Sequence, residues 1–250
     1  MQPEKQPRVS VVIPAFNEQD YIGPCIDSLL DQEIPPLEII VVDNNSEDDT
    51  DSIATSHNLV RVIRERKQGI VYARNTGYNA AKGDIIARCD ADSILPPTWT
   101  KQIIAALSDP KIAAVTGPCT IYDLPKRLRH LKTGLSASHT LVYFKGSKAM
   151  LGHEVLFGSN MALTKQVWEQ VKDNVCLDES KMHEDTDLAV HIAEVGGVIK
   201  FDPKLQASIA ARLRPDTVQA KTSITEVLSY LNRWTNSKLS HGPSKRDKRS

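Results

Sequence analysis

The chain has 250 residues, enough to bury the core of one large α/β domain or of one domain with a modest appendage. Its 31 Lys and Arg residues balance its 31 Asp and Glu residues, so the net charge is zero and no overall field favours nucleic acid as a partner. Its four cysteines lie far apart without zinc-ligand spacing, which suits a reducing cytoplasm.

Short apolar runs in the first half predict strands that are covered on both faces, because most are rich in Val and Ile at consecutive positions. These runs are Val9 to Ile13, Ile39 to Val42, Leu59 to Ile63, Ile85 to Cys89 and Ile112 to Thr116. The helices expected between them begin near Asp20, at a cap at Ser46, at Ile70 (ending at Ala81) and near Pro97. Strands that alternate with helices favour a three-layer α/β/α fold around a mainly parallel sheet.

The second half is less regular, and Tyr122 to Met150 shows no clean period. Beyond it, Leu156 to Leu163 reads as a turn followed by a strand, and a helix is expected around Lys165 to Val171. An apolar helix is expected over Leu188 to Val195 and a last strand over Val198 to Phe201.

Polar and acidic residues follow three of the predicted strands. They are Pro14 to Glu18, Asp43 to Ser46, and Asp90-Ala91-Asp92. Ligands of open α/β sheets bind beyond the carboxyl ends of the strands. A ligand site is therefore expected at this edge.

The run Asp90-Ala91-Asp92 is the most informative of these segments. Two carboxylates separated by one small residue can hold a hard divalent cation, and Ala91 leaves room for a bulky ligand. Mg²⁺ and Mn²⁺ usually bridge one or two protein carboxylates to substrate phosphates, so a diphosphate bound through the metal is the first hypothesis. The alternative is a solvated turn or a helix cap, because short acidic motifs often occur by chance.

A second acidic segment, residues 183–187, precedes the apolar helix of the second half. Its acids either complement the positive end of the helix dipole or include a catalytic base.

Taken together, these motifs resemble those of the family-2 glycosyltransferases, which have the GT-A nucleotide-sugar fold. Each motif alone is weak, but the ordered set is specific, and it covers roughly residues 8 to 205. The matching stretches are Val11 to Glu18, Val41 to Ser46 with Asp49-Thr50, Ala73 to Gly77, Asp90 to Ser93, Gly158 to Met161, and Glu184 to Asp187.

The resemblance implies a nucleotide-diphospho-sugar donor, linked to UDP or GDP. The residues implied to bind it are Pro14, Ala15, Asn17, Glu18, Asp43, Arg74, Asp90 and Ala91. An Asp carboxylate can accept a hydrogen bond from uracil or from guanine, so Asp43 does not choose between the two bases. Asp92 is implied as the direct ligand of Mn²⁺ or Mg²⁺, with Asp90 facing both ribose and metal.

For catalysis, Asp185 matches the family's general base, which favours inversion at the anomeric carbon. A retaining outcome stays open, because some related enzymes on this fold retain configuration. Asn160 and Glu184 are implied to contact the acceptor or the donor sugar. His183 is either a third metal ligand or a hydrogen-bonded neighbour of the acids.

The resemblance divides the chain into flexible residues 1–7, a nucleotide-sugar-binding half over 8–118, an acceptor-binding and catalytic half over 119–214, and a C-terminal helix with a basic tail over 215–250. The acceptor is expected to be a glycan, a lipid-linked molecule or a small molecule. No apolar run of about 20 residues is present, so we expect a cytoplasmic protein. The basic residues 244–250 form either a disordered solubilising tail or a tether to anionic lipid at the inner membrane face.

Three other enzyme classes fit less well. A sugar-nucleotide pyrophosphorylase needs a Gly-rich loop where this chain has Pro14 to Glu18. A haloacid-dehalogenase-type phosphatase carries Asp-x-Asp after its first strand, not its fourth, and a nicotinamide dehydrogenase needs Gly-x-Gly-x-x-Gly. A nucleotide-sugar-binding protein without turnover is the alternative outside the enzymes.

Overall fold

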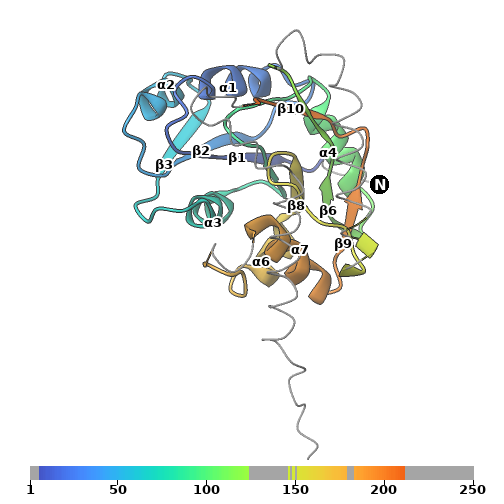
Figure 1. Ribbon diagram of the computed structural model, residues 1–250. Coiled ribbons are helices and arrows are strands. Elements are labelled where there is room, and N and C mark those ends of the chain that lie inside the picture. Colours follow the sequence, from blue (N-terminus) through green and yellow to red (C-terminus); the bar gives the residue numbers. More distant parts are fainter. Residues whose placement is uncertain (1–5, 124–145, 147, 150, 179–182, 212–250) are drawn as a thin grey trace, which may run out of the picture.

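The computed structural model describes residues 6–123, 146, 148, 149, 151–178 and 183–211. These residues form a seven-stranded sheet with helices on both faces (Figure 1). The C-terminal helix and basic tail expected over 215–250 lie outside the described residues, as does most of the aperiodic stretch from 122 to 150. None of the described helices is long and apolar enough to span a bilayer.

The sheet confirms the strands predicted from the apolar runs, with bounds that differ by at most two residues. In chain order these strands are β1 (Val9–Ala15), β2 (Glu38–Asp43), β3 (Val60–Arg64), β4 (Ile85–Arg88), β6 (Ile112–Thr116), β8 (Met161–Thr164) and β9 (Val198–Phe201). Across the sheet they lie in the order β3-β2-β1-β4-β8-β6-β9.

Strand β8 runs against its two neighbours, β4 and β6, whereas the other pairs in the sheet are parallel. The mainly parallel sheet is therefore confirmed, with one reversed strand near its middle. Because β8 starts where β4 ends, and Arg88 pairs with Met161, residues just before β8 lie beside residues just after β4. This reversal adds a third chain segment to the expected ligand edge.

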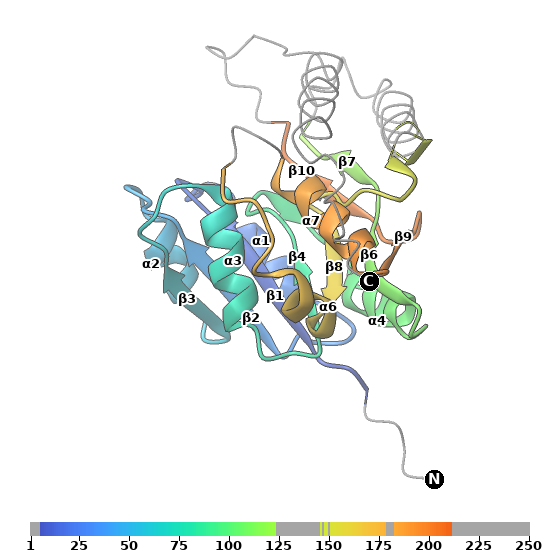
Figure 2. The same cartoon turned by 90° about the horizontal axis from the view of Figure 1, so that it is seen from below.

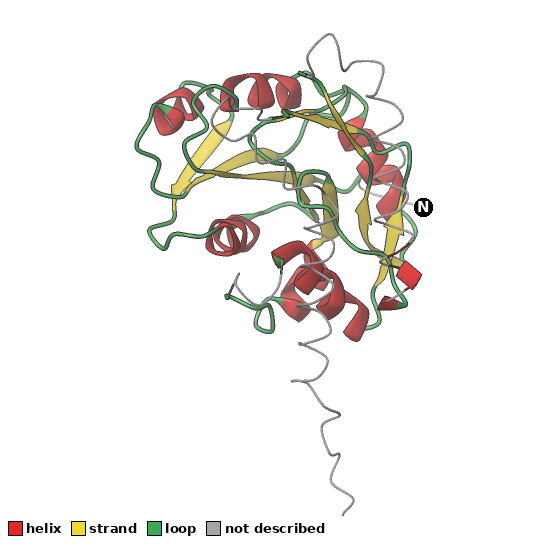
Figure 3. Cartoon of the chain, viewed as in Figure 1, coloured by secondary structure: helices red, strands yellow, loops and turns green. Residues whose placement is uncertain are grey.

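Helices cover both faces of the sheet (Figures 2 and 3). One face carries α1 (Ile22–Leu30), α2 (Thr50–Thr55) and α4 (Trp99–Leu107), and the other carries α3 (Ile70–Ala80), α6 (Lys165–Val171) and α7 (Glu184–Glu194). Side chains of a strand point alternately to the two faces. Val11 and Ile13 accordingly join the core under α1, while Val12 joins the core under α3. The predicted three-layer α/β/α fold is confirmed.

The prediction that Ser46 caps the second helix is wrong, because α2 begins at Thr50. The Ser46 hydroxyl accepts a hydrogen bond from the backbone N–H of Asn17, at 3.0 Å. The N–H of Glu47 donates to the Asn17 side chain at 2.9 Å. Hydrogen bonds to a neighbouring loop thus replace those of a first helical turn.

A second, three-stranded sheet was not predicted. Its strands are β5 (Ser93–Ile94), β7 (Cys119–Ile121) and β10 (Ala207–Ile209), in the order β5-β10-β7. Strands of two or three residues are too short to show a period in the sequence. Because β5 follows Asp92 directly, this small sheet borders the expected metal site.

Helix α3 lies so close to β1 that Gly77 has no room for a side chain. A Cβ added there would lie 2.2 Å from Val12 Cγ1 and 3.0 Å from Val42 Cγ2. We expect Gly77→Ala to lower the free energy of unfolding by about 1–3 kcal/mol, the usual cost of overpacking a filled core. Urea denaturation measures this loss.

Gly23 in α1 supplies the control for Gly77. A Cβ added at Gly23 would meet only Ile53 Cγ2, at 3.7 Å, which is ordinary van der Waals contact. Gly23→Ala should be neutral or stabilising, because alanine has the higher helix propensity. Equal effects of the two substitutions would contradict the close packing of α3 on β1.

Candidate active site

The carboxyl-terminal edge of the sheet gathers most of the residues singled out in the sequence. Ala15 at the end of β1 pairs in register with Asp43 at the end of β2. Asp90 and Asp92 follow β4, which is the other neighbour of β1. The sequence prediction of polar residues after three strands therefore agrees with the observed strand order.

Hydrogen bonds join the loop after β1 to the loop after β2. Besides the two bonds between Asn17 and residues 46 and 47, the N–H of Glu18 donates to the Thr50 hydroxyl at 2.8 Å. Asn17 has a φ of 55°, a left-handed conformation that Asn adopts more readily than most residues. The two loops thus form one continuous surface beside Asp43.

The loop after β3 is tied to the same surface through Asn44. The Asn44 amide donates to the backbone carbonyls of Glu65 and Lys67, at 2.9 and 2.8 Å, and its oxygen accepts from the N–H of Gly69 at 2.8 Å. Asp43 itself is buried, and its Oδ1 accepts from the N–H of Ser46 at 3.2 Å. Three loops therefore support the position of Asp43.

The carboxylate of Asp90 is shared between two partners. Its Oδ1 lies 3.3 Å from Nη2 of Arg88, and its Oδ2 accepts a hydrogen bond from the hydroxyl of Ser159. Ser159 belongs to the turn that leads into β8, so the reversed strand places a hydroxyl against the acidic motif. Asp92 is buried beside β5, close enough to Tyr122 that burial and nearby carboxylates, Asp92 among them, raise the pKa of this tyrosine to about 12.

Asp90 and Asp92 offer carboxylate oxygens, the ligands that a hard divalent cation prefers. Within the described part of the chain, no group of three or more His, Cys, Asp or Glu side chains could hold a metal ion, which disfavours His183 as a third ligand. Mg²⁺ and Mn²⁺ commonly take one or two protein carboxylates and complete their shells with phosphate oxygens and water. Two carboxylates at a strand end match that requirement.

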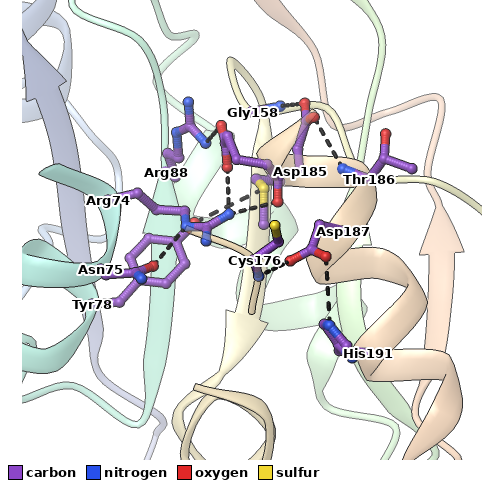
Figure 4. Close-up of polar contacts among 12 residues, drawn as sticks. Arg74, Asn75, Tyr78, Arg88, Gly158, Cys176, Asp185, Thr186, Asp187 and His191 are labelled. Atoms are coloured by element: carbon purple, nitrogen blue, oxygen red, sulfur yellow. Dashed lines mark hydrogen bonds and ion pairs between the residues drawn. The ribbon is translucent and has the colours of Figure 1, made fainter. Parts of the chain in front are cut away.

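Asp185 lies in the first turn of α7 and points toward the same turn before β8 (Figure 4). Its Oδ2 accepts from the N–H of Gly158 at 3.0 Å, and its Oδ1 accepts from the N–H of Thr186 at 3.0 Å. Adjacent residues of one turn, Gly158 and Ser159, therefore bond the carboxylates of Asp185 and Asp90. The candidate base and the candidate metal site meet at this turn.

The surroundings of Asp185 raise the pKa of its carboxyl group. Burial raises the pKa of the Asp185 carboxyl above its ordinary value, and the neighbouring carboxylate of Glu184 raises it further. Arg88 and the Gly158 N–H act in the opposite direction but do not cancel the shift. A carboxylate with a raised pKa is a better proton acceptor than an ordinary aspartate.

Glu184, the first residue of α7, is bonded on both carboxylate oxygens. Nη1 of Arg74 donates to Oε2 at 2.5 Å, and Nη1 of Arg88 donates to Oε1. Burial alone would raise the pKa of Glu184, but the guanidinium groups of Arg88 and Arg74 outweigh it and hold the pKa below its ordinary value. Glu184 is therefore a buried anion between two arginines.

This cluster differs from what the resemblance implies for Arg74 and Glu184. Arg74 is fully buried and also donates to the backbone carbonyl of Glu184 at 2.6 Å. A contact of Arg74 with base or phosphate, or of Glu184 with an acceptor hydroxyl, stays a prediction that requires these ion pairs to open. Arg88 is not among the residues predicted from the motifs. An arginine inside an apolar strand is nevertheless a signal in the sequence, since a buried cation needs an anionic partner.

The contact of Asn160 with a sugar stays a prediction, because in the structure the side chain is occupied by partners within the protein. Its side chain is fully buried: Nδ2 donates to the carbonyls of Pro118 and Leu205, and Oδ1 accepts from Nε1 of Trp99 at 2.8 Å. The amide therefore joins the turn before β8 to the segments beside β7 and β10. These bonds hold the turn against its neighbours.

Asp187, the other acid of this segment, also has structural partners. Its Oδ2 accepts from the N–H of Cys176 at 2.7 Å, and its Oδ1 lies 3.5 Å from Nε2 of His191 (Figure 4). Hydrogen bonding to Asp187, more than any other cause, raises the pKa of His191. Asp187 thus connects the first turn of α7 to the segment before the helix.

A sequence model of glycosyl transferase family 2 matches residues 10–168. The chain belongs to this family. Among the curated relatives of this family-2 chain, the putative glycosyltransferase EpsH of Bacillus subtilis (strain 168) is 34% identical over 107 residues, which are 41% of this chain and 31% of EpsH. The chain thus spans about a third of that relative's length.

Solved structures give the same fold for this family-2 chain. The mannosyltransferase PcManGT from Pyrobaculum calidifontis, in complex with GDP-Man and Mn²⁺, aligns with a TM-score of 0.69 and 22% identity over 97% of this chain and 67% of that chain. Glucosyl-3-phosphoglycerate synthase from Mycobacterium tuberculosis, in complex with Mn²⁺, UDP and glucosyl-3-phosphoglycerate, aligns with a TM-score of 0.60 and 22% identity over 91% of this chain and 80% of that chain. The expected GT-A fold is confirmed.

Proposed function

We propose that this chain is a glycosyltransferase that moves a sugar from a nucleotide-diphosphate donor to an acceptor hydroxyl. The observation that carries the proposal is the turn before β8. Its Gly158 N–H bonds Asp185, and its Ser159 hydroxyl bonds Asp90. A metal-site carboxylate and a candidate base thus flank one turn, as sugar transfer from a metal-bound diphosphate requires.

For the donor, we assign the base and ribose to the surface formed by the three joined loops. The residues proposed to contact them are Pro14, Ala15, Asn17, Glu18 and Asp43, with Ala91 beside the diphosphate. PcManGT was solved with GDP-Man, and the mycobacterial synthase was solved with UDP-Glc in another complex, so a GDP-linked and a UDP-linked donor both fit this fold. The carboxylate of Asp43 can accept a hydrogen bond from either base.

We assign a Mn²⁺ or Mg²⁺ ion to Asp92 and Asp90. When bound, such an ion would neutralise charge that develops on the departing diphosphate. Asp92 would supply a direct oxygen ligand. Asp90 is held by Arg88 and Ser159, and its remaining lone pairs would face the ion and the ribose.

Asp185 would accept the proton of the acceptor hydroxyl. Each of its oxygens accepts one hydrogen bond from the backbone, and a carboxylate oxygen can accept two. Capacity for the acceptor hydroxyl therefore remains on both oxygens. A single base opposite the leaving diphosphate supports inversion of the anomeric configuration. We propose a glycan, a lipid-linked molecule or a small molecule as the acceptor class.

A thermal-shift panel tests the donor assignment. UDP, GDP and ADP, and their glucose- or mannose-linked forms, are added with and without MnCl₂. A ligand at 100 times its Kd stabilises a protein by about 2.7 kcal/mol. For a domain of this size, that corresponds to a rise in Tm of several degrees, at roughly 2–4 °C per kcal/mol.

The expected result is a rise with uridine or guanosine diphosphates that is larger when manganese is present. A panel in which no nucleotide raises the Tm would refute the donor site. A nucleotide sugar could instead stabilise the protein without any release of nucleoside diphosphate, whichever glycan, lipid-linked or small-molecule acceptor is added. That result would favour the alternative, a nucleotide-sugar-binding protein without turnover.

A further inference from the structure

We propose that Arg88 is a positioning residue that holds Asp90 and the start of helix α7 at a fixed separation, and so sets the distance from the donor cation to the base. This inference rests on the proposed function, because it assigns the two ends that Arg88 connects. Arg88 itself touches neither substrate nor metal in this proposal.

The first support is that the guanidinium of Arg88 bonds two carboxylates from distant parts of the chain. Its Nη2 lies 3.3 Å from Asp90 Oδ1, and its Nη1 donates to Glu184 Oε1. Its side chain is only 2% exposed. A guanidinium presents several donors in one fixed plane, so two carboxylates bonded to it are held at a defined separation.

The second support is that Glu184 is itself fixed, so that the bond from Arg88 holds a helix and not one flexible side chain. Arg74 of α3 donates both to the carboxylate and to the backbone carbonyl of Glu184. The backbone of the first residue of α7 is thereby anchored. Asp185 follows it directly, so its position depends on the same bonds.

The third support is the packing of Arg88 against the turn before β8. A Cβ added at Gly158 would lie 2.7 Å from Nη2 of Arg88, so this turn lies directly on the guanidinium. The N–H of Gly158 bonds Asp185, and the adjacent Ser159 hydroxyl bonds Asp90. Arg88 thus contacts Asp90, the residue before Asp185, and the turn that bonds both acids.

Arg88→Met, which keeps most of the side-chain length and removes the charge, tests the proposal. Two quantities are measured: the manganese dependence of UDP and GDP binding by calorimetry, and kcat with the donor that the protein uses. We expect both to fall by about 10- to 100-fold, the usual effect of losing a residue that orients metal ligands. Arg88→Lys should partly restore either the manganese-dependent binding or kcat relative to Arg88→Met, but not both. The ammonium group of lysine cannot bond two carboxylates in one plane as a guanidinium does.

Arg61→Met is the matched control. Arg61 also pairs with a glutamate, Glu38 at 3.0 Å, and also donates to a backbone carbonyl, that of Ala80 at 2.7 Å. It is the second residue of β3, near the amino-terminal end of that strand and away from the carboxyl edge. Its loss should lower the Tm without changing manganese-dependent binding or kcat.

The outcomes separate a positioning role from a merely structural one. If Arg88→Met lowers the Tm but leaves manganese-dependent binding and kcat at the values of Arg61→Met, the proposal is overturned. If Arg88→Met does not fold, Arg88→Lys carries the test, and wild-type values of both quantities in that variant would refute it. Manganese-dependent nucleotide binding that is absent from the wild-type protein would refute the proposed function itself.

Discussion

Asp185→Asn should lower turnover by about 10²-fold or more while leaving donor binding nearly unchanged, because removal of a general base affects the chemical step. The asparagine oxygen can still accept the hydrogen bond from Gly158, so the start of α7 should keep its position. Initial rates at saturating donor and manganese, together with calorimetric binding of UDP and GDP, measure the two effects separately.

Asp187→Asn is the matched control for this prediction, because it makes the same chemical change two residues away on α7. Asp187 bonds Cys176 and His191, so its substitution should reduce stability and leave turnover close to wild type once the protein is folded. Near-wild-type turnover in Asp185→Asn, with a large loss in Asp187→Asn, would move the base to Asp187.

The pH profile follows from the same assignment. Burial, with help from Glu184, raises the pKa of Asp185, so kcat/KM should fall as pH decreases through a value above that of an ordinary aspartate. The sign follows from the chemistry: below this pKa the carboxyl is protonated and cannot accept the acceptor's proton. In Asp185→Asn the residual rate should lose this acidic limb. An identical limb in both proteins would assign the titration to another group.

Asp92→Ala should abolish the manganese dependence of nucleoside diphosphate binding. In the wild-type protein, we expect manganese to tighten the binding of UDP or GDP by about tenfold or more, which corresponds to about 1.4 kcal/mol. Loss of the direct carboxylate ligand removes the link between ion and protein, so calorimetry on the variant should give the same weak affinity with and without MnCl₂.

Asp84→Ala supplies the control at the opposite end of β4. Asp84 precedes the strand, is exposed, and accepts a hydrogen bond from the N–H of Arg8 at 2.9 Å. Its loss should leave the manganese effect intact. A manganese effect that survives in Asp92→Ala would place the cation elsewhere.

The main sheet could be predicted because its strands are continuous apolar runs, such as Val9 to Ile13 and Ile85 to Cys89, whose burial on both faces is visible in the sequence. The antiparallel direction of β8 could not be predicted, because the residues of a single strand do not indicate whether it pairs parallel or antiparallel with its neighbours. The three strands of the small sheet are too short to show a period.

The candidate site was predictable where residues lie at a strand end or just after it, as Asp43 and Asp90 do. It was not predictable where a role depends on partners distant in the chain. In the sequence Asn160 looks like a polar turn residue. In the structure its side-chain amide is hydrogen-bonded to Pro118, Leu205 and Trp99. Glu184 reads as one of several acids at a helix start, yet it is the anion between Arg74 and Arg88.

The hydrogen bonds that join the loops after β1, β2 and β3 have a thermodynamic consequence for the proposed donor. Ordering a backbone residue costs about 1–2 kcal/mol of conformational entropy. Here the hydrogen bonds of Asn17, Asn44 and Thr50 order the loops when the protein folds, so this entropy is lost before any nucleotide binds. The proposed donor site is therefore preorganised. Less of the favourable free energy of its contacts with the nucleotide is offset by ordering the loops, and the affinity is higher for that reason.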